Sequence, residues 1–405
     1  MTESGGWGEN PRSIPRIFFE FGQYWQLMAS LWEFLIVGGV AALATLLLTP
    51  LTRRLAVRVG ATASPSARKV HESETPSLGG LAMLGGVGAG LLTAWTMGTF
   101  DAVFRSFTDI AGVALAALII FAVGVADDIR EVSAPAKVAG IVLSGTVLAL
   151  AGVSVLWFRV PFTGFVQLSA DLSVVVTVVW LLVMANAINL IDGLDGLAGG
   201  IVAIASGSFF VYAMQLAAND VLFASNPGAL LAVITAGICV GFLPFNLHPA
   251  KTFMGDGGAL LLGLMLAAST VSVGGRLDQS VDGQVFFFFA PLVIPLILLG
   301  VPLVDLTLAV VRRASRRGVG IADADKEHLH HRLMRLGHGH RRTVFILWLW
   351  TALLCGVVLY STLSGSGAAA LPFAGGALAL LLYTVFHPGI GTSSNVAQSK
   401  AEVEV

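Results

Sequence analysis

Long apolar segments recur along almost the whole chain and constrain its fold more than any other feature. Each approaches the roughly 20 apolar residues that cross a bilayer as a helix. In lipid only helices and closed barrels satisfy their own backbone hydrogen bonds, and segments of this length suit helices. The sequence therefore predicts an all-α polytopic membrane protein with about 11 transmembrane helices. The segments are 31–50, 78–97, 107–126, 138–155, 172–188, 196–215, 229–247, 257–275, 286–311, 343–362 and 368–387.

Composition agrees with a membrane protein. Of 405 residues, 56% are hydrophobic and 12% are charged, whereas soluble domains carry about a quarter charged residues. The net charge of −1 gives no sign of a nucleic-acid partner, and none is expected. We expect one transmembrane domain over residues 31–388. Residues 1–30 are expected to form an arm outside or at the membrane interface, and 389–405 a disordered cytoplasmic tail.

Lysine and arginine are distributed unevenly between the connections. If the first connection, 51–77, lies in the cytoplasm, 18 of the 23 Lys and Arg residues fall on the cytoplasmic side and five outside. Cytoplasmic loops of membrane proteins carry such an excess. The prediction is a multi-pass protein of the inner or plasma membrane with its N-terminus outside. Five groups of polar residues also fall on the cytoplasmic side, which argues for a single assembled site.

One of these groups lies between two long apolar runs. Asn186, Asn189, Asp192 and Asp195 are spaced by three, so a helix continuing through them would align them along one side. An interhelical hydrogen-bond ladder is the structural alternative, but carboxylates and amides are costly in a membrane segment and usually have a function there. Their oxygens are the ligands that Mg²⁺ prefers.

Further carboxylates lie at the ends of other apolar segments. Asp127 and Asp128 are adjacent and repel each other, so they favour a cation or a proton between them; Lys137 follows in the sequence. The alternative is a solvated helix end. Asp256, flanked by glycines, either caps a helix or ligates a metal beside a diphosphate bound at the helix start. Asn246, at the end of the preceding segment, can approach the same site.

Two basic groups complete the polar set. Imidazoles beside arginine or lysine suit phosphate binding and pH sensitivity, while the alternative is a basic patch attracted to anionic lipid. The groups comprise Lys69 and His71 in the first connection, and His328, His330, His331 and Arg332 in the most basic one.

Together these residue types favour phosphoryl transfer. In that reaction a metal and cationic side chains bridge phosphate oxygens and align the attacking and leaving groups. The chain has neither the P-loop sequence nor the G-x-S-x-G elbow. A site at the membrane boundary would let a lipid phosphate meet a water-soluble nucleotide. A multi-span transporter, the alternative from another class, predicts polar residues near mid-span and often inverted repeats.

These stretches resemble the motifs of the polyprenyl-phosphate N-acetylhexosamine-1-phosphate transferase family of membrane enzymes. The resemblance runs in order, with compatible spacing, from residue 68 to residue 333. One such motif would be weak, whereas five in register are specific. The matching stretches are Arg68–His71 with Pro76–Gly80, Val125–Asp128 with Lys137, Asn186–Ala198, Asn246 with Met254–Leu260, and His328–Leu333.

The resemblance implies a catalytic domain that transfers a sugar-1-phosphate from a UDP-N-acetylhexosamine to polyprenyl phosphate and releases UMP. It implies ten or eleven helices around a cytoplasmic-facing active-site groove, often in a homodimer. It also implies Mg²⁺ as cofactor, with Mn²⁺ as the alternative ion. Asp256 and Asn189 would hold the metal, and Asp127 and Asp128 would join Asp256 as catalytic carboxylates beside the lipid phosphate. The implied substrate-binding residues are Lys69, His71, Lys137, Asn186, Asp192, Asp195, Asn246, His328, His330, His331 and Arg332.

The histidine motif distinguishes between branches of the family. Leu329 separates His328 from His330, which resembles the branch that moves N-acetylglucosamine-1-phosphate at the first membrane step of a cell-envelope polysaccharide. The alternative is the phospho-N-acetylmuramoyl-pentapeptide transferase of peptidoglycan synthesis, whose members tend to show three consecutive histidines. We therefore expect UDP-N-acetylglucosamine (UDP-GlcNAc) as the donor.

Overall fold

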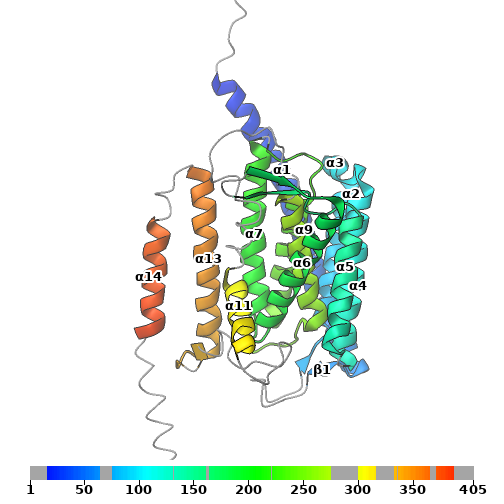
Figure 1. Cartoon of the computed structure of the whole chain (residues 1–405), viewed down its shortest axis with the longest axis vertical. Helices are drawn as coiled ribbons and strands as arrows, with labels where there is room; N and C mark the ends of the chain where they lie inside the picture. The colour runs from blue at the N-terminus through cyan, green and yellow to red at the C-terminus, as the bar shows by residue number, and fades with distance from the viewer. Residues whose placement is uncertain are drawn as a thin grey trace, which may run out of the picture.

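The computed structural model is a bundle of roughly upright helices (Figure 1). It describes residues 16–63, 75–130, 132–160, 164–219, 221–274, 300–315, 333–334, 336–364 and 371–386. Its helices are α1 (Arg16–Val59), α2 (Gly79–Thr96), η1 (Gly98–Phe100), α3 (Asp101–Arg105), α4 (Phe107–Arg130), α5 (Ala134–Leu150), α6 (Ala170–Ile191), α7 (Leu197–Ala218), α8 (Gly228–Asn246), α9 (Gly255–Gly274), α11 (Gly300–Ser315), α13 (His340–Ser364) and α14 (Leu371–Phe386).

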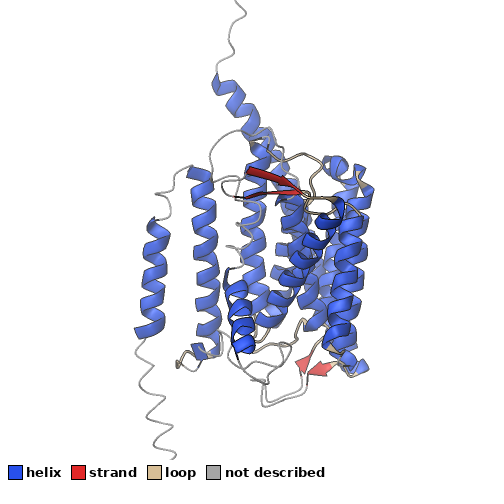
Figure 2. Ribbon diagram, viewed as in Figure 1, coloured by secondary structure: helices blue, strands red, loops and turns tan. Residues whose placement is uncertain are grey.

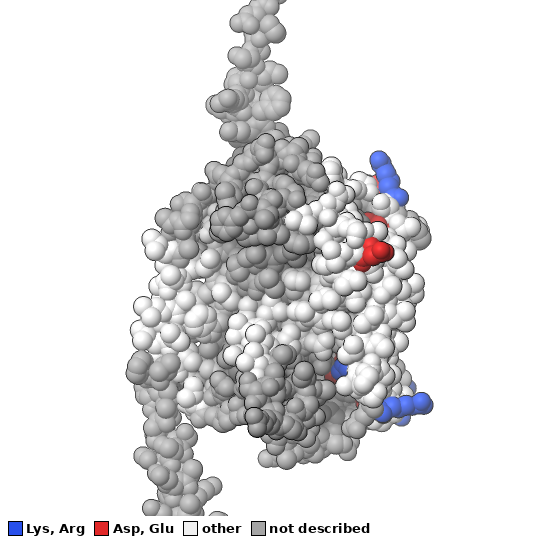
Figure 3. Space-filling view, viewed as in Figure 1, with Lys and Arg blue, Asp and Glu red and all other residues white. Residues whose placement is uncertain are grey.

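The predicted all-α polytopic membrane class is confirmed. Among the described residues, eight helices are long and apolar enough to cross a membrane, and α5 and α14 are shorter apolar helices. The charged side chains visible in Figure 3 lie toward the two ends of the molecule, with uncharged residues between them. Each predicted segment coincides with a described helix, although 286–311 is described only from residue 300, as α11. The total of 11 spans therefore stays a prediction.

The N-terminal boundary of the first helix differs from the expectation. Residues 16–30, predicted as part of an arm, form the first turns of α1, which continues unbroken to Val59. Pro15 stands immediately before the helix, where its fixed φ favours a helix start, and the next 15 residues contain a single glycine and no proline. Residues 1–15 and the predicted tail lie outside the described residues.

Helix α9 forms the centre of the bundle. Every residue from Gly257 to Gly274 is buried, and helices α2, α4, α6 and α8 pack against it. A helix that is apolar on all sides is expected in such an interior position.

Glycines allow two of these neighbours to approach the first turn of α9 closely. A Cβ atom on Gly124 of α4 would lie 2.5 Å from the Cα of Gly257, and one on Gly80 of α2 would lie 2.5 Å from the Cα of Gly258. Small residues at such crossings let helix backbones approach one another in membranes. Because Asp128 follows Gly124 by about one helical turn, the crossing places that carboxylate beside the start of α9.

Two small antiparallel hairpins, which the sequence did not predict, lie at opposite ends of the bundle (Figure 2). Strands β3 (Trp157–Val160) and β4 (Gly164–Gln167) connect α5 to α6. At the other end, β1 (Thr62–Ala63) pairs with β2 (Thr75–Pro76). The Pro76 carbonyl accepts hydrogen bonds from the backbone N–H of Phe253 at 2.8 Å and the hydroxyl of Thr252 at 3.0 Å. The second hairpin thus fixes the loop that leads into α9.

Candidate active site

The ends of four helices bring most of the predicted carboxylates together at the β1–β2 end of the bundle. Asp127 and Asp128 lie in the last turn of α4, Asn189 in the last turn of α6, and Asp256 in the first turn of α9. Lys137, in the first turns of α5, lies among them.

Lys137 links two of these carboxylates. Its Nζ atom lies 2.8 Å from Oδ2 of Asp127 and also pairs with Oδ2 of Asp256. The amide nitrogen of Asn189 donates to the other Asp256 oxygen at 2.9 Å. The Lys137 side chain is 17% exposed and that of Asp256 33%, so the charge cluster is partly open to solvent. The structure thus brings the predicted residues Asn189, Asp256 and Lys137 together, while their roles stay predictions.

The two adjacent aspartates of α4 take different partners. Successive residues on a helix point about 100° apart. Asp127 accepts a bond from the backbone N–H of Val132 at 2.7 Å in addition to its pairing with Lys137. Asp128 instead accepts from the backbone N–H groups of Asp256 at 2.9 Å and Gly257 at 3.2 Å. It thereby caps the unsatisfied donors at the start of α9 from another helix.

A glycine with left-handed backbone geometry makes this cap possible. Gly255 has a φ of +70°, which side chains other than glycine rarely adopt. A Cβ atom there would also lie 2.4 Å from Oδ2 of Asp128. The glycine preceding Asp256 therefore sets both the direction of α9 and the space for the Asp128 carboxylate.

The predicted polar stripe does not continue along one helix. Helix α6 ends at Ile191, Asp192 is its C-cap, and the chain turns through Gly196 at a φ of +77° before α7 begins. Asp192 and Asp195 therefore occupy a turn, because glycines at 193 and 196 favour termination over further helix. Asn186 remains within α6, and its amide donates to the Leu182 carbonyl at 2.7 Å.

The pKa of the Asp192 carboxyl reflects the negative charge at this end of the bundle. Burial raises the pKa of its carboxyl well above the usual range, and the charges of Asp256, Asp128 and Asp195 raise it further. Several carboxylates thus lie close together at this end of the bundle. Among the described residues, Lys137 is the one cation that pairs with Asp127 and Asp256. Such a surplus of negative charge favours a bound cation.

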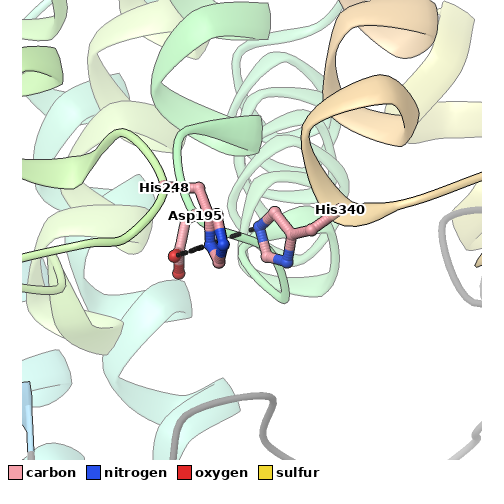
Figure 4. A group of neighbouring side chains, drawn as sticks. All are labelled: Asp195, His248 and His340. Carbon is pink, nitrogen blue, oxygen red and sulfur yellow. Dashed lines mark hydrogen bonds and ion pairs between the residues drawn. The ribbon is translucent and has the colours of Figure 1, made fainter.

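Asp195 belongs to a second cluster, with His248 and His340 (Figure 4). Its almost fully buried carboxylate lies 2.8 Å from Nδ1 of His248 and 4.0 Å from Nε2 of His340, and it accepts from the backbone N–H of Ala250 at 3.0 Å. The two imidazoles stack with centroids 4.2 Å apart. Arg341 donates to the His248 carbonyl at 3.1 Å. The cluster joins the α6–α7 turn, the loop after α8 and the start of α13.

Sequence reasoning missed His248 and His340. His248 lies two residues after the predicted Asn246, and His340 stands with Arg341 at the start of an apolar helix. Both could therefore have been recognised in the sequence as polar residues at the end of a predicted transmembrane segment. With Gly339, Arg341 and Arg342 they line a pocket of about 390 Å³. The ligand atoms of Asp195, His248 and His340 lie within 4.8 Å of one another, but the two arginines favour an anion rather than a metal ion in this pocket.

Asn246 braces the loops of the site. The side chain is 2% exposed; its oxygen accepts from the Gly196 N–H at 3.0 Å and its nitrogen donates to the Thr252 carbonyl at 3.2 Å. Direct contact of Asn246 with substrate stays a prediction. The predicted residues Lys69, His71, His328, His330, His331 and Arg332 lie outside the described residues.

Replacing Asn246 with alanine is expected to lower the free energy of unfolding by about 1–3 kcal/mol, because two buried backbone groups lose their partners. Thermal unfolding of the purified protein measures the change. Asn219→Ala is the matched control, since Asn219 is exposed and bonds only within its own helix end. An Asn246→Ala protein of unchanged stability and weakened UDP-GlcNAc binding would make Asn246 a substrate ligand rather than a brace.

Comparison with known proteins identifies the chain. The sequence model of the family described as glycosyl transferase family 4 matches residues 110–274 of this chain. A decaprenyl-phosphate N-acetylglucosaminephosphotransferase of Mycobacterium tuberculosis (strain ATCC 25618 / H37Rv) is 40% identical over 329 residues, which cover 80% of this chain and 81% of the relative. The chain belongs to glycosyl transferase family 4.

Other relatives bear on the branch within the family. A probable undecaprenyl-phosphate N-acetylglucosaminyl 1-phosphate transferase of Bacillus subtilis (strain 168) is 37% identical over 312 residues, covering 76% of this chain and 80% of the relative. A phospho-N-acetylmuramoyl-pentapeptide-transferase of Mycobacteroides abscessus is 30% identical over 366 residues, covering 81% of this chain and 96% of the relative. The order of identities confirms the N-acetylglucosamine branch predicted for this family 4 member.

Proposed function

We propose that this protein transfers N-acetylglucosamine-1-phosphate from UDP-GlcNAc to polyprenyl phosphate, the first membrane step of a cell-envelope polysaccharide. The observation that carries the proposal is the meeting of Asp127, Asp256, Asn189 and Lys137 from four helices, in a chain 40% identical to an enzyme named for this transfer. An oxygen of the lipid phosphate attacks the β-phosphorus of the donor. The bond from that phosphorus to the UMP oxygen breaks, and UMP leaves with the bonding electrons.

The donor set fits Mg²⁺. Carboxylate and amide oxygens are its preferred protein ligands, and Asp256 and Asn189 supply both kinds beside a surplus of carboxylates. When bound, the ion would neutralise charge on the diphosphate. Mn²⁺ offers a second test of the same donor set.

The chain's own residues have separate tasks in this proposal. Lys137 holds the carboxylates of Asp127 and Asp256 in place and offers positive charge to phosphate oxygens. Asp128 fixes the direction of α9 and hence the position of Asp256. The acceptor phosphate, with a second pKa of about 6, is largely ionised at pH 7, so the attack does not require a strong base.

A pocket at the same end of the bundle is lined by His248, His340, Arg341 and Arg342. The two guanidinium groups give this end of the bundle positive charge, which suits anionic ligands. By the distribution of Lys and Arg we place this end of the bundle in the cytoplasm and the N-terminus outside. Assembly as a homodimer stays a prediction.

Release of UMP tests the proposal directly. Purified protein incubated with UDP-GlcNAc and Mg²⁺ is expected to release UMP only after polyprenyl phosphate is added, with an equal amount of polyprenyl-diphospho-GlcNAc formed. Chelation of the metal should stop the release, and Mn²⁺ should restore part of it. Turnover of the UDP-N-acetylmuramoyl-pentapeptide nucleotide alone would overturn the choice of donor in favour of the peptidoglycan branch.

A further inference from the structure

A groove of about 480 Å³ runs between α13 and α14 at the edge of the bundle. Its walls are largely apolar and include Phe345 and Leu349 of α13 and Gly376, Ala379 and Leu380 of α14. A Cβ atom on Gly376 would lie 3.0 Å from the Leu353 side chain of α13, so a larger residue there would crowd the groove. Arg341, Arg342 and Tyr383 gather at one end of the groove.

That end is the one at which the site lies. His340, the first residue of α13, reaches Asp195, and Arg341 and Arg342 follow it. The end of α14 is fixed beside them, because His338 bonds the Thr384 carbonyl at 3.0 Å and its ring lies against Tyr383. The groove therefore begins at the membrane boundary with two guanidinium groups and continues along apolar helix surfaces.

We propose that this groove binds an anionic phospholipid, with the headgroup phosphate on Arg341 and Arg342 and an acyl chain along Gly376 and Ala379. The match is one of charge and shape. Guanidinium groups bind phosphate oxygens in paired hydrogen bonds, and basic residues at the membrane surface attract anionic lipid.

The position of the groove separates this lipid from the reacting acceptor. In Figure 1, α14 lies at one edge of the bundle, whereas α4 and α5, which carry Asp127 and Lys137, lie at the opposite side. A lipid bound in the groove nevertheless affects the site through Arg341. Arg341 also donates to the His248 carbonyl, so a phosphate that holds Arg341 steadies the loop whose imidazole binds Asp195.

Lipid retention tests the proposal without relying on enzymatic activity. The full-length protein is reconstituted in phosphatidylcholine, in phosphatidylglycerol, or in phosphatidylcholine with polyprenyl phosphate, and bound lipid is measured by native mass spectrometry. Wild type is expected to retain phosphatidylglycerol over phosphatidylcholine. Arg342→Gln should reduce that retention about fivefold, because one arginine near anionic lipid contributes about this factor to binding. Gly376→Leu should reduce it by filling the groove.

Two matched variants control for charge and size. Arg54→Gln removes an exposed arginine from α1, and Gly375→Leu adds the same side chain where no other atom lies within 4 Å. Both should retain phosphatidylglycerol as wild type does. Equal retention of the neutral lipid, or retention unchanged in both Arg342→Gln and Gly376→Leu, overturns the proposal. Arginine-dependent retention of polyprenyl phosphate alone also overturns it, because the groove would then bind the acceptor. A shift in oligomeric state with Gly376→Leu, with lipid retention unchanged, overturns it as well, because the groove would then contact a second copy of the protein.

Discussion

Asp256→Asn is expected to reduce UMP release by on the order of 10³-fold or more, the loss typical when charge stabilisation at a reacting phosphate is removed. The substitution keeps the size of the side chain but removes the charge that pairs with Lys137 and that would hold the metal. The measurement is UMP release at saturating Mg²⁺, together with thermal unfolding to show that the variant folds.

A matched substitution separates this effect from a general loss of helix charge. Asp171 also lies in the first turn of a membrane helix, α6, but is exposed and sits at the opposite end of that helix from Asn189. Asp171→Asn should therefore leave UMP release unchanged. Full activity in Asp256→Asn would remove Asp256 from the metal site and with it the central assignment of the mechanism.

Lys137→Met is expected to lower the rate of transfer by about two to three orders of magnitude, because it removes the cation fixed among the phosphate-binding groups. It also leaves Asp127 and Asp256 facing each other without Lys137 between them. The variant should therefore unfold at a lower temperature than wild type. Added Mg²⁺ should raise its unfolding temperature more than it raises that of wild type, since a divalent ion can replace the lost charge.

Two controls accompany this variant. Lys137→Arg keeps the charge and should retain more activity than Lys137→Met, although a guanidinium does not fit every ammonium site. Arg58→Met removes an exposed positive charge from the last turn of α1 and should change neither property. If Lys137→Met were as active as wild type, Lys137 would have no part in the reaction.

The helices could be predicted from the sequence because one physical requirement, burial of backbone polar groups within lipid, determines both their length and their composition. The boundaries of the helices were harder to predict from the sequence. Residues 1–30 are mixed in character, with glycine, proline and aromatic residues, which indicates an arm, yet residues 16–30 belong to α1. Asp192 and Asp195 fitted a helical spacing of three, but the glycines between and after them turned the chain.

The partners within the site could not be predicted, because they join residues far apart in the sequence. Lys137 and Asp256 are 119 residues apart, and Asp128 lies 128 residues before the N–H group of Asp256 that it caps. Spacing along one helix carries no information on these pairs. Their residue types did indicate a phosphate and metal site, whereas the pairing depends on the glycine crossings that set how α4 and α9 meet.

The joining of Asp195 to His340 has a consequence for biosynthesis. Residue 340 leaves the ribosome only after most of the protein has been inserted into the membrane, so a nascent chain with all its carboxylates in place still lacks the imidazole from α13. A product that stopped before this point would keep the acidic residues but leave this pocket open on one side. The pocket beside Asp195 therefore forms only once α13 follows the helices that carry the carboxylates.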